Sequence, residues 1–194
     1  MKRFFDIFLS LLTIVILSPF FLVIAILIAI ETKGGIFYVQ SRVGRDNKDF
    51  NLYKFRSMRN GADKKGLLTI GENDNRITKI GYFIRKYKID EFPQLINILK
   101  GEMSIVGPRP EVRKYVALYN EEQLKVLSVK PGLTDYASIA FIDESNILSN
   151  ASDPEAYYIN KIMPLKIKLN LQYIKNQSLK VDFYIIGKTL LRIL

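Results

Sequence analysis

The sequence predicts an α+β fold in which an apolar membrane helix precedes a small, mostly helical domain carrying a short β-hairpin. Three observations support this prediction. An uncharged apolar run covers residues 7–30, two β-like runs come after it between 36 and 58, and apolar residues recur at helical spacing through the rest of the chain. The 194 residues suffice for one compact domain beside the membrane segment.

The apolar run is long enough to reach across a bilayer. As one helix, residues 7–30 would extend about 36 Å, against about 30 Å for the hydrocarbon core of a bilayer. A cleavable signal peptide has a shorter apolar region followed by a small-residue cleavage site, and this run has neither feature. The segment is therefore predicted to remain in the membrane.

Ser18 and Pro19 interrupt the run near its middle. Proline removes an intrahelical hydrogen bond and bends a helix, while a serine hydroxyl can bind a freed carbonyl. Each of the two resulting arms is too short to span a bilayer alone. A spanning helix with a proline kink is one interpretation, because such kinks are common. A re-entrant hairpin is the other, and it is favoured by basic residues on both flanks, namely Lys2, Arg3, Lys33, Arg42 and Arg45.

Past the membrane segment, we expect a hairpin, a loop and a helix. The runs 36–44 and 50–58 alternate in part and are separated by polar residues, as in a β-hairpin. Residues 61–75 are rich in Gly, Asp, Asn and Lys, which predicts a loop. Apolar residues at helical spacing opposite basic ones then predict an amphipathic helix over 77–88.

Helices are expected to dominate the remainder of the chain. A short helix over 90–99 would carry Pro93 in its first turn, where proline is tolerated. The other predicted segments are a helix over 111–129, a Pro-Gly loop over 130–139, a helix over 153–176 kinked at Pro164, and a helix over 182–194. Several of these helices are basic and amphipathic, which is typical of interfacial helices on a bilayer surface. Alternatively, their apolar faces form the core.

The composition limits the chemistry that the chain can perform. Lys and Arg number 29 against 19 acidic residues, and the net charge of +10 favours partners that bear phosphate, such as nucleotides, anionic lipid or nucleic acid. The chain has no His and no Cys. Their absence excludes Ser-His-Asp triads, thiolate nucleophiles, ordinary zinc sites and disulfides. Polar chemistry must therefore use carboxylates, Lys, Arg, hydroxyl groups or a hard metal ion.

The most informative stretch covers residues 88–110. It sets two adjacent carboxylates, Asp90 and Glu91, before a short amphipathic run and the turn Gly107-Pro108-Arg109-Pro110. Adjacent carboxylates repel each other, and a Mg²⁺ ion on one of them relieves the repulsion. The two prolines stiffen the backbone around Arg109, which suits a cation aimed at phosphate. The structural alternatives for the acidic pair are a favourable acidic helix start and a surface ion pair, and the alternative for Arg109 is a turn with a solvated side chain.

Four motifs in the same order as in a known family add a resemblance over essentially the whole chain. They are Ser18-Pro19, the run KFRSM at 54–58, Asp90-Glu91 and Pro108-Arg109-Pro110. The chain resembles the bacterial sugar transferases, small monotopic phosphoglycosyl transferases that begin glycan assembly on a polyprenol carrier. The resemblance implies transfer of a sugar-1-phosphate from a UDP-sugar to undecaprenyl phosphate, with release of UMP and assistance from Mg²⁺.

The resemblance also implies an organisation and residue roles. Residues 1–33 would be a re-entrant membrane hairpin, and residues 34–194 a catalytic domain on the cytoplasmic face of the bacterial inner membrane. Asp90 would be the nucleophile that forms an aspartyl-phosphosugar intermediate, and Glu91 would hold the metal. A carboxylate suits this role because an acyl phosphate is an anhydride, like the bond it replaces. The expected substrate-binding residues are Lys54, Arg56, Arg85, Pro108, Arg109 and Pro110. The alternative for each of the cations is an ordinary solvent-exposed side chain on the protein surface.

The chain departs from the family pattern at two places. Tyr87, Lys88 and Ile89 precede the acidic pair where relatives often carry Thr-Ser-Leu or Ser-Leu, and residues 133–145 replace a frequent Asn-Gly-Arg run. The second departure lies in a loop that is expected to face the sugar or the nucleotide, so the resemblance does not identify the sugar that is transferred. A further Ile-Asp-Glu at 142–144 lacks a Gly-Pro-Arg-Pro partner, so we expect it to be a substrate loop or a solvated segment.

Two other functions remain open from the sequence. One is a metal-dependent hydrolase of nucleotide sugars or polyprenyl pyrophosphates, which would accept water instead of polyprenyl phosphate. The other is a basic membrane-tethered module that binds nucleic acid or anionic lipid without catalysis. The expected partners are a UDP-sugar, undecaprenyl phosphate and the lipid bilayer, with no nucleic acid, and a homo-oligomer is compatible with the sequence.

Overall fold

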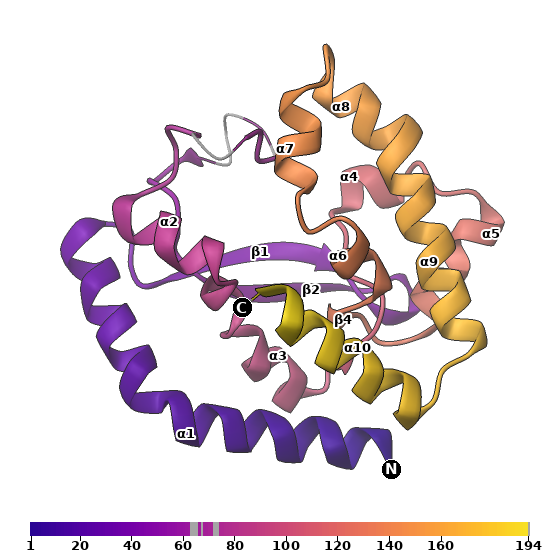
Figure 1. The fold of residues 1–194 in the computed structure, drawn as a ribbon, viewed down its shortest axis with the longest axis horizontal. Helices are drawn as coiled ribbons and strands as arrows, with labels where there is room; N and C mark the ends of the chain where they lie inside the picture. Colours follow the sequence, from indigo (N-terminus) through magenta and orange to yellow (C-terminus); the bar gives the residue numbers. More distant parts are fainter. Residues whose placement is uncertain (63–65, 67, 72–73, 194) are drawn as a thin grey trace.

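The computed structural model describes residues 1–62, 66, 68–71 and 74–193. It is an α+β fold with a long apolar helix and a small, mostly helical body, so the predicted fold class is confirmed at this level (Figure 1). In the described residues, two strand pairs lie within the body, one antiparallel and one parallel. The strands β1 and β2 cross the middle of the body, with helices around them (Figure 1).

Helix α1 (Lys2–Glu31) is long and apolar enough to cross a membrane by length and composition, with a mean hydropathy of 3.0 in its most apolar window. Pro19 lies inside it, and the Ser18 hydroxyl donates a hydrogen bond to the Val15 carbonyl at 2.9 Å. Figure 1 shows the helix running along one edge of the body and then bending toward α2. The body therefore lies in the concave side of a bent helix.

One face of α1 packs on the body while the rest of its apolar surface is exposed. Ile24 and Ile28 are buried in a cluster with Phe55 and Ile84, and Ile14 packs against a second cluster around Leu95. Large apolar side chains on the outer face are exposed: Phe8, Leu11, Leu12, Val15, Ile16, Phe20, Leu22, Val23, Ile26, Leu27 and Ile30. Such a surface is typical of a lipid-facing helix.

The predicted hairpin is confirmed. Strands β1 (Phe37–Val43) and β2 (Asp49–Phe55) pair antiparallel and are joined by a 3₁₀ turn over Arg45–Asn47. The buried Asn97 amide connects this hairpin to the next helix, because it accepts a hydrogen bond from the Tyr53 backbone and donates one to the Asn51 carbonyl. The predicted loop over 61–75 falls partly outside the described residues.

The predicted helix over 77–88 is confirmed as α2 (Lys79–Lys86). The predicted helix over 90–99 is wrong at its start. The acidic pair lies in a separate 3₁₀ turn, Ile89–Glu91, and α3 (Gln94–Lys100) begins only after Pro93. Because proline cannot donate a backbone hydrogen bond, it suits the boundary between the turn and the helix.

Two further predictions are corrected between residues 111 and 139. The predicted helix over 111–129 is broken into α4 (Arg113–Val116), α5 (Glu121–Leu124) and a 3₁₀ turn over Lys125–Ser128, because a capping box between Asn120 and Gln123 starts a new helix. The predicted loop over 130–139 instead holds strand β4 (Gly132–Thr134) and helix α6 (Tyr136–Ala140). Strand β4 pairs parallel with β3 (Ser104–Val106).

The remainder of the body is helical. It comprises α7 (Glu144–Ser149), α8 (Pro154–Tyr157), a π-helical turn over Tyr158–Ile162, α9 (Met163–Lys175) and α10 (Leu179–Ile193). The kink at Pro164 stays a prediction; the π-helical turn ends at Ile162, two residues before this proline, which lies in the first turn of α9. A core cluster joins α7, the π-helical turn and α9 to α4 and to the 3₁₀ turn after α5, through Val112, Tyr115, Val126, Leu148, Tyr158, Ile162, Met163 and Ile167.

Candidate active site

The acidic pair is presented by a short turn whose ends are buried in the body. Lys88 has a left-handed backbone conformation (φ 55°), which ends the α2 segment and starts the turn. Ile89 then packs into the cluster that contains Ile24 and Ile28 of α1. Asp90 and Glu91 are only 4% and 9% exposed. The turn therefore holds two carboxylates in a largely dehydrated position.

Glu91 is the anionic centre of an ion cluster. The Arg109 guanidinium binds both of its oxygens, with Nη1 2.9 Å from Oε2 and Nη2 on Oε1. The Lys54 Nζ lies 3.5 Å from Oε1. Burial opposes ionisation of Glu91, but the charges of Arg109 and Lys54 hold the pKa of this carboxyl well below its ordinary value. Glu91 is thus a fixed anion.

Asp90 has the opposite environment. In the part of the chain that the structure describes, no donor is hydrogen-bonded to its carboxylate, although the charges of Lys54, Arg85 and Lys88 lie near enough to act on it. Burial raises the pKa of the Asp90 carboxyl above its ordinary value, against the opposing charge of Lys54. An ionised Asp90 is therefore a weakly solvated carboxylate without a fixed partner.

Two cations reach the site from the hairpin. Lys54 on β2 is paired with Tyr38 on β1. Burial lowers the pKa of the Lys54 amine, and the negative charge of Glu91 opposes this shift. Arg42, on the same face two pairs along, donates hydrogen bonds to the Pro110 carbonyl at 3.1 Å and to Glu111 at 3.1 Å. Arg42 was not among the site residues expected from the sequence. Its alternation with Tyr38 and Gln40 along β1 could have indicated it.

The loop that carries Arg109 is held by backbone contacts. A Cβ added at Gly132 would lie only 2.1 Å from the Gly107 nitrogen. The two backbone segments can therefore come this close only if residue 132 is glycine. Asp135, which is fully buried, accepts a hydrogen bond from the Arg109 backbone N–H at 3.1 Å. Arg109 is therefore aimed at the acidic pair by its backbone as well as by its ion pair.

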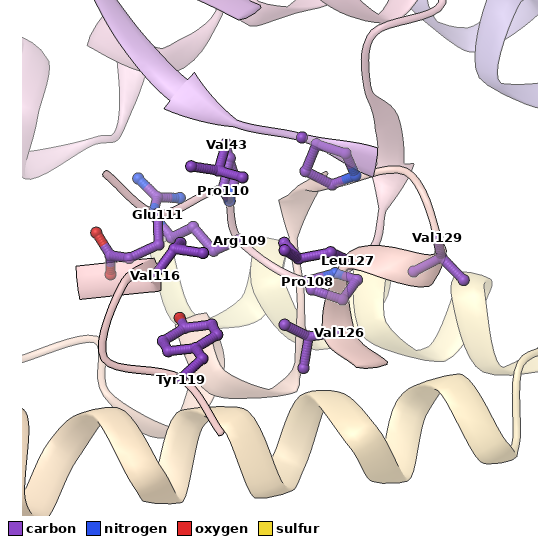
Figure 2. A pocket seen from close by; sticks show the side chains of 12 residues that line it. Val43, Pro108, Arg109, Pro110, Glu111, Val116, Tyr119, Val126, Leu127 and Val129 are labelled. Atoms are coloured by element: carbon purple, nitrogen blue, oxygen red, sulfur yellow. The ribbon is translucent and has the colours of Figure 1, made fainter. Parts of the chain in front are cut away.

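An apolar hollow lies behind this loop. Figure 2 shows Val43 on one side of Pro108 and Pro110, and Tyr119 and Val126 on the other. The prolines rest on these side chains, which fixes the outer edge of the site. Pro108 and Pro110 thus act here as packing residues, with the Pro108 carbonyl bound to the Gly132 N–H at 2.9 Å.

Arg85 and Arg56 lie apart from the ion cluster. The Arg85 guanidinium donates to the Thr69 hydroxyl at 2.9 Å, on the α2 side of Asp90. Arg56 is just beyond the end of β2 and donates to the carbonyls of Gly35 and Phe37. Lys54 thus reaches the ion cluster, whereas the Arg56 guanidinium is turned back onto the start of β1, and the substrate-binding role expected for Arg56 stays a prediction.

The second Ile-Asp-Glu is not part of this cluster. Asp143 is exposed at the start of α7, and Glu144 forms an ion pair with Lys166 of α9 at 2.8 Å. Its surroundings therefore match the solvated segment expected from the sequence.

The acidic pair has the donor chemistry that Mg²⁺ prefers. In the described residues, no three His, Cys, Asp or Glu side chains gather as metal ligands. Magnesium commonly uses one or two carboxylates and completes its shell with water and substrate phosphate oxygens. Among the residues that the structure describes, none donates a hydrogen bond to the Asp90 carboxylate, and Glu91 is its neighbour. These residues fit an ion that a phosphate substrate shares.

Comparisons with known proteins found a matching family and several relatives. The profile of the family described as "Bacterial sugar transferase" matches residues 1–194. The chain is 37% identical to the UDP-N-acetylgalactosamine-undecaprenyl-phosphate N-acetylgalactosaminephosphotransferase of Aeromonas hydrophila, over 100% of this chain and 43% of that protein. It is 33% identical to the UDP-glucose:undecaprenyl-phosphate glucose-1-phosphate transferase of Escherichia coli, over 99% of this chain and 40% of that protein.

A third relative is closer in length. The uncharacterized sugar transferase EpsL of Bacillus subtilis is 35% identical over 100% of this chain and 87% of that protein. The chain thus spans less than half of the Aeromonas and Escherichia relatives.

Proposed function

This chain belongs to the bacterial sugar transferase family, and on that premise we propose that it transfers a sugar-1-phosphate from a UDP-sugar to undecaprenyl phosphate and releases UMP. The observation that carries the proposal is the pair of neighbouring carboxylates with opposite environments. Glu91 is neutralised by Arg109 and Lys54, whereas Asp90 is buried and has no hydrogen-bonded donor in the described residues. One carboxylate is held and the other is available.

In the first half-reaction, a carboxylate oxygen of Asp90 attacks the phosphorus that bears the sugar. The bond between this phosphorus and the bridging oxygen breaks, and that oxygen leaves with the electron pair as part of UMP. The new bond is an acyl phosphate that joins Asp90 to the phosphosugar. Weak solvation favours Asp90 as nucleophile because few hydrogen bonds must be given up before attack.

In the second half-reaction, a phosphate oxygen of undecaprenyl phosphate attacks the same phosphorus. The carboxylate of Asp90 leaves with the electron pair, and the product is an undecaprenyl diphosphate sugar. Both half-reactions exchange one anhydride for another, so the intermediate is not a deep energy minimum. The cations Lys54, Arg109 and Arg85 would bind the phosphate charges in both steps.

The proposal includes Mg²⁺ and assigns Glu91 to hold it. When bound, the ion supplies charge neutralisation at the diphosphate. Arg109 would then share its positive charge between Glu91 and a substrate phosphate. The adjacent oxygen donors and the absence of His and Cys support a hard cation rather than a soft one.

We also propose that residues 1–33 are re-entrant and that residues 34–194 lie on the cytoplasmic face of the bacterial inner membrane. Polar groups at both ends of α1 contact the same body, since Lys2 binds the Val106 carbonyl and Glu31 accepts from the backbone of Lys79 and Ile80. A bilayer placed between the two ends of α1 would separate these contacts. The bend at Ser18 and Pro19 supports the same arrangement.

A UMP-release assay with several UDP-sugars tests the function. Asp90→Asn should lower UMP release by about 1,000-fold or more, with or without undecaprenyl phosphate, because it removes the nucleophile. The matched control is Asp143→Asn, in the second Ile-Asp-Glu, which should keep near-normal activity. Mass spectrometry should find a phosphosugar on the Asp90 peptide of the unmodified chain. An Asp90→Asn variant that turns over normally would refute the assignment. UMP release that continues over many turnovers with water as the sole acceptor, beyond one UMP per protein molecule, would favour a hydrolase.

A further inference from the structure

The amino end of α1 is bound to the strand that leads to Arg109. The Asp6 carboxylate, only 5% exposed, accepts hydrogen bonds from the Ser104 hydroxyl at 2.9 Å and from the Ile105 backbone N–H at 3.1 Å. The Lys2 ammonium donates to the Val106 carbonyl at 3.0 Å. We call Lys2 and Asp6 the amino-end clasp. It holds all three residues of β3, and Arg109 follows β3 by three residues.

The carboxyl end of α1 is bound to the helix that leads to the acidic pair. The two Glu31 oxygens accept hydrogen bonds from the backbone N–H groups of Lys79 and Ile80 at 2.7 and 2.8 Å. These are unpaired donors of the first turn of α2, which a carboxylate satisfies well. We call Glu31 the carboxyl-end clasp. It fixes the start of α2, and the catalytic turn begins three residues after α2 ends.

Between the clasps, the second arm of α1 packs directly on the catalytic turn. Ile24 and Ile28 share a buried cluster with Ile89, the residue before Asp90. The ring of Phe21 lies 5.2 Å from the ring of Phe92, the residue after Glu91. The acidic pair is therefore flanked on both sides by residues that rest on the membrane helix.

These contacts place α1 as a brace between the two halves of the site. The Glu91–Arg109 ion pair joins the turn that follows α2 to the loop that follows β3, and α1 is the element whose ends bind both segments. Apolar packing allows an element to slide, whereas hydrogen bonds fix its register because they are directional. A carboxylate in an apolar helix is also costly unless it is satisfied, so Asp6 holds its position strongly.

We propose that α1 sets the spacing between the Asp90–Glu91 turn and Arg109, so that Asp6 and Glu31 are positioning residues for the transfer reaction. This inference rests on the proposed function. A displacement of about 1 Å between catalytic groups can lower a rate about 100-fold. The bend of α1 in the bilayer is then coupled to the rate of the chemical step through the two clasps.

Single-turnover kinetics on the full chain in lipid nanodiscs test the proposal. The variants are Glu31→Gln and Asp6→Asn, each isosteric, and UMP formation is followed without undecaprenyl phosphate using the UDP-sugar that the unmodified chain uses best. Each variant should keep the burst amplitude, which counts competent molecules, and lower the rate constant at least about fivefold. The matched controls are Glu122→Gln and Asp46→Asn, whose side chains are exposed, and both should keep the normal rate constant.

A purely structural role would have a different signature. In that case, the burst amplitude would fall while the rate constant stayed normal, and this result would overturn the proposal, as would normal kinetics in both variants. Hydrogen exchange of the same proteins provides a readout that does not depend on activity. Glu31→Gln should raise exchange in peptides covering 79–92, and Asp6→Asn in peptides covering 104–110. If the unmodified chain releases no UMP, the proposed function fails, and unchanged exchange in these peptides would separately refute the coupling.

Discussion

At the scale of single residues, Asp90 and Glu91 are adjacent in the chain but differ in what burial does to them. Both lose water, yet only Glu91 is compensated by bound cations, so its carboxyl has a lowered pKa while that of Asp90 is raised. A carboxyl whose pKa is lowered by folding stabilises the fold at pH values above its ordinary pKa. A carboxyl whose pKa is raised by folding destabilises the fold at pH values above that raised pKa. The fold therefore tolerates an unfavourable charge at Asp90, as is typical of functional sites.

This difference predicts opposite stability changes for two isosteric substitutions. At pH 7, Asp90→Asn should raise the melting temperature, because it removes a buried charge whose pKa is raised. Glu91→Gln should lower the melting temperature, because it leaves Arg109 and Lys54 without their anion. Thermal unfolding of both variants in the same detergent measures the effect.

The pH dependence supplies the control for this pair. As pH falls through the raised pKa of Asp90 toward about 4, the ordinary value of an aspartate, the gain from Asp90→Asn should shrink, because Asp90 is then protonated in the folded unmodified chain. The deficit of Glu91→Gln should shrink only at lower pH, progressively from about 4, the ordinary value of a glutamate, down through the lowered pKa of Glu91. Equal shifts of the two variants in the same direction would contradict the environments described for the two carboxylates.

Arg109 should not be replaceable by lysine. Its guanidinium contacts both oxygens of Glu91, which a single ammonium cannot reproduce. Arg109→Lys should lower kcat/KM for the UDP-sugar about 10- to 100-fold, corresponding to about 1–3 kcal/mol of charge-assisted hydrogen bonding. Arg113→Lys is the matched control, since Arg113 binds Asp49 at the surface. Steady-state kinetics that show equal small losses in both variants would speak against a role for Arg109 at the diphosphate.

Sequence reasoning named Lys54, Glu91 and Arg109, which the structure brings together in the ion cluster, because these residues have distinctive neighbours in the chain. The proline pair around Arg109 and the doubled carboxylate are local signals, and Lys54 lies in a motif of the family. Asp135 has no such signal, since it resembles an ordinary cap of α6 until the fold brings it to the Arg109 backbone. Arg56 shows the converse, because it lies in the same family motif as Lys54, but β2 ends just before it and its guanidinium binds the Gly35 and Phe37 carbonyls instead.

At the scale of elements, periodicity predicted helices where no backbone interruption intervenes. Helices α2 and α10 follow their apolar spacing closely. The segment 111–129 has helical spacing too, but the Asn120 capping box outcompetes continuation there. The three-residue strands β3 and β4 are too short to give a periodic signal, and their parallel pairing depends on residues far apart in the chain.

The close contact of β3 and β4 predicts a strong effect of one methyl group. In Gly132→Ala, the new Cβ would collide with the backbone of Gly107, so the strands must separate. We expect a loss of about 1–3 kcal/mol in the free energy of unfolding, and reduced UMP release because the Arg109 loop moves. Chemical denaturation and the UMP assay measure the two effects.

Gly187→Ala is the matched control for this substitution. Gly187 lies within α10, and a Cβ there would meet no atom within 4 Å. Because alanine is the better helix former, this variant should be unchanged or more stable by about 1 kcal/mol. A Gly132→Ala chain as stable as the Gly187→Ala chain would mean that the two strands do not require glycine at this contact.

At the scale of the whole molecule, the bent helix around the body is what sequence alone left undecided. The Ser18-Pro19 break allowed both a kinked spanning helix and a hairpin. Contacts from both ends of α1 to β3 and α2 favour the hairpin, and these contacts involve Asp6 and Glu31, which carry no motif. Long-range polar contacts of this kind are not encoded in local periodicity.

The hairpin predicts that both flanks of α1 lie on the same side of the membrane. The chain has no native cysteine, so a cysteine tag placed before Met1, or Lys33→Cys in a separate protein, can be labelled in intact cells without background. A thiol reagent that cannot cross the inner membrane should label neither position, because both are cytoplasmic, while a permeant reagent should label both. A spanning helix would instead expose one flank alone to the impermeant reagent. Since the clasps need both ends of α1 on one body, such one-sided labelling would remove the hairpin and the brace between β3 and α2 together.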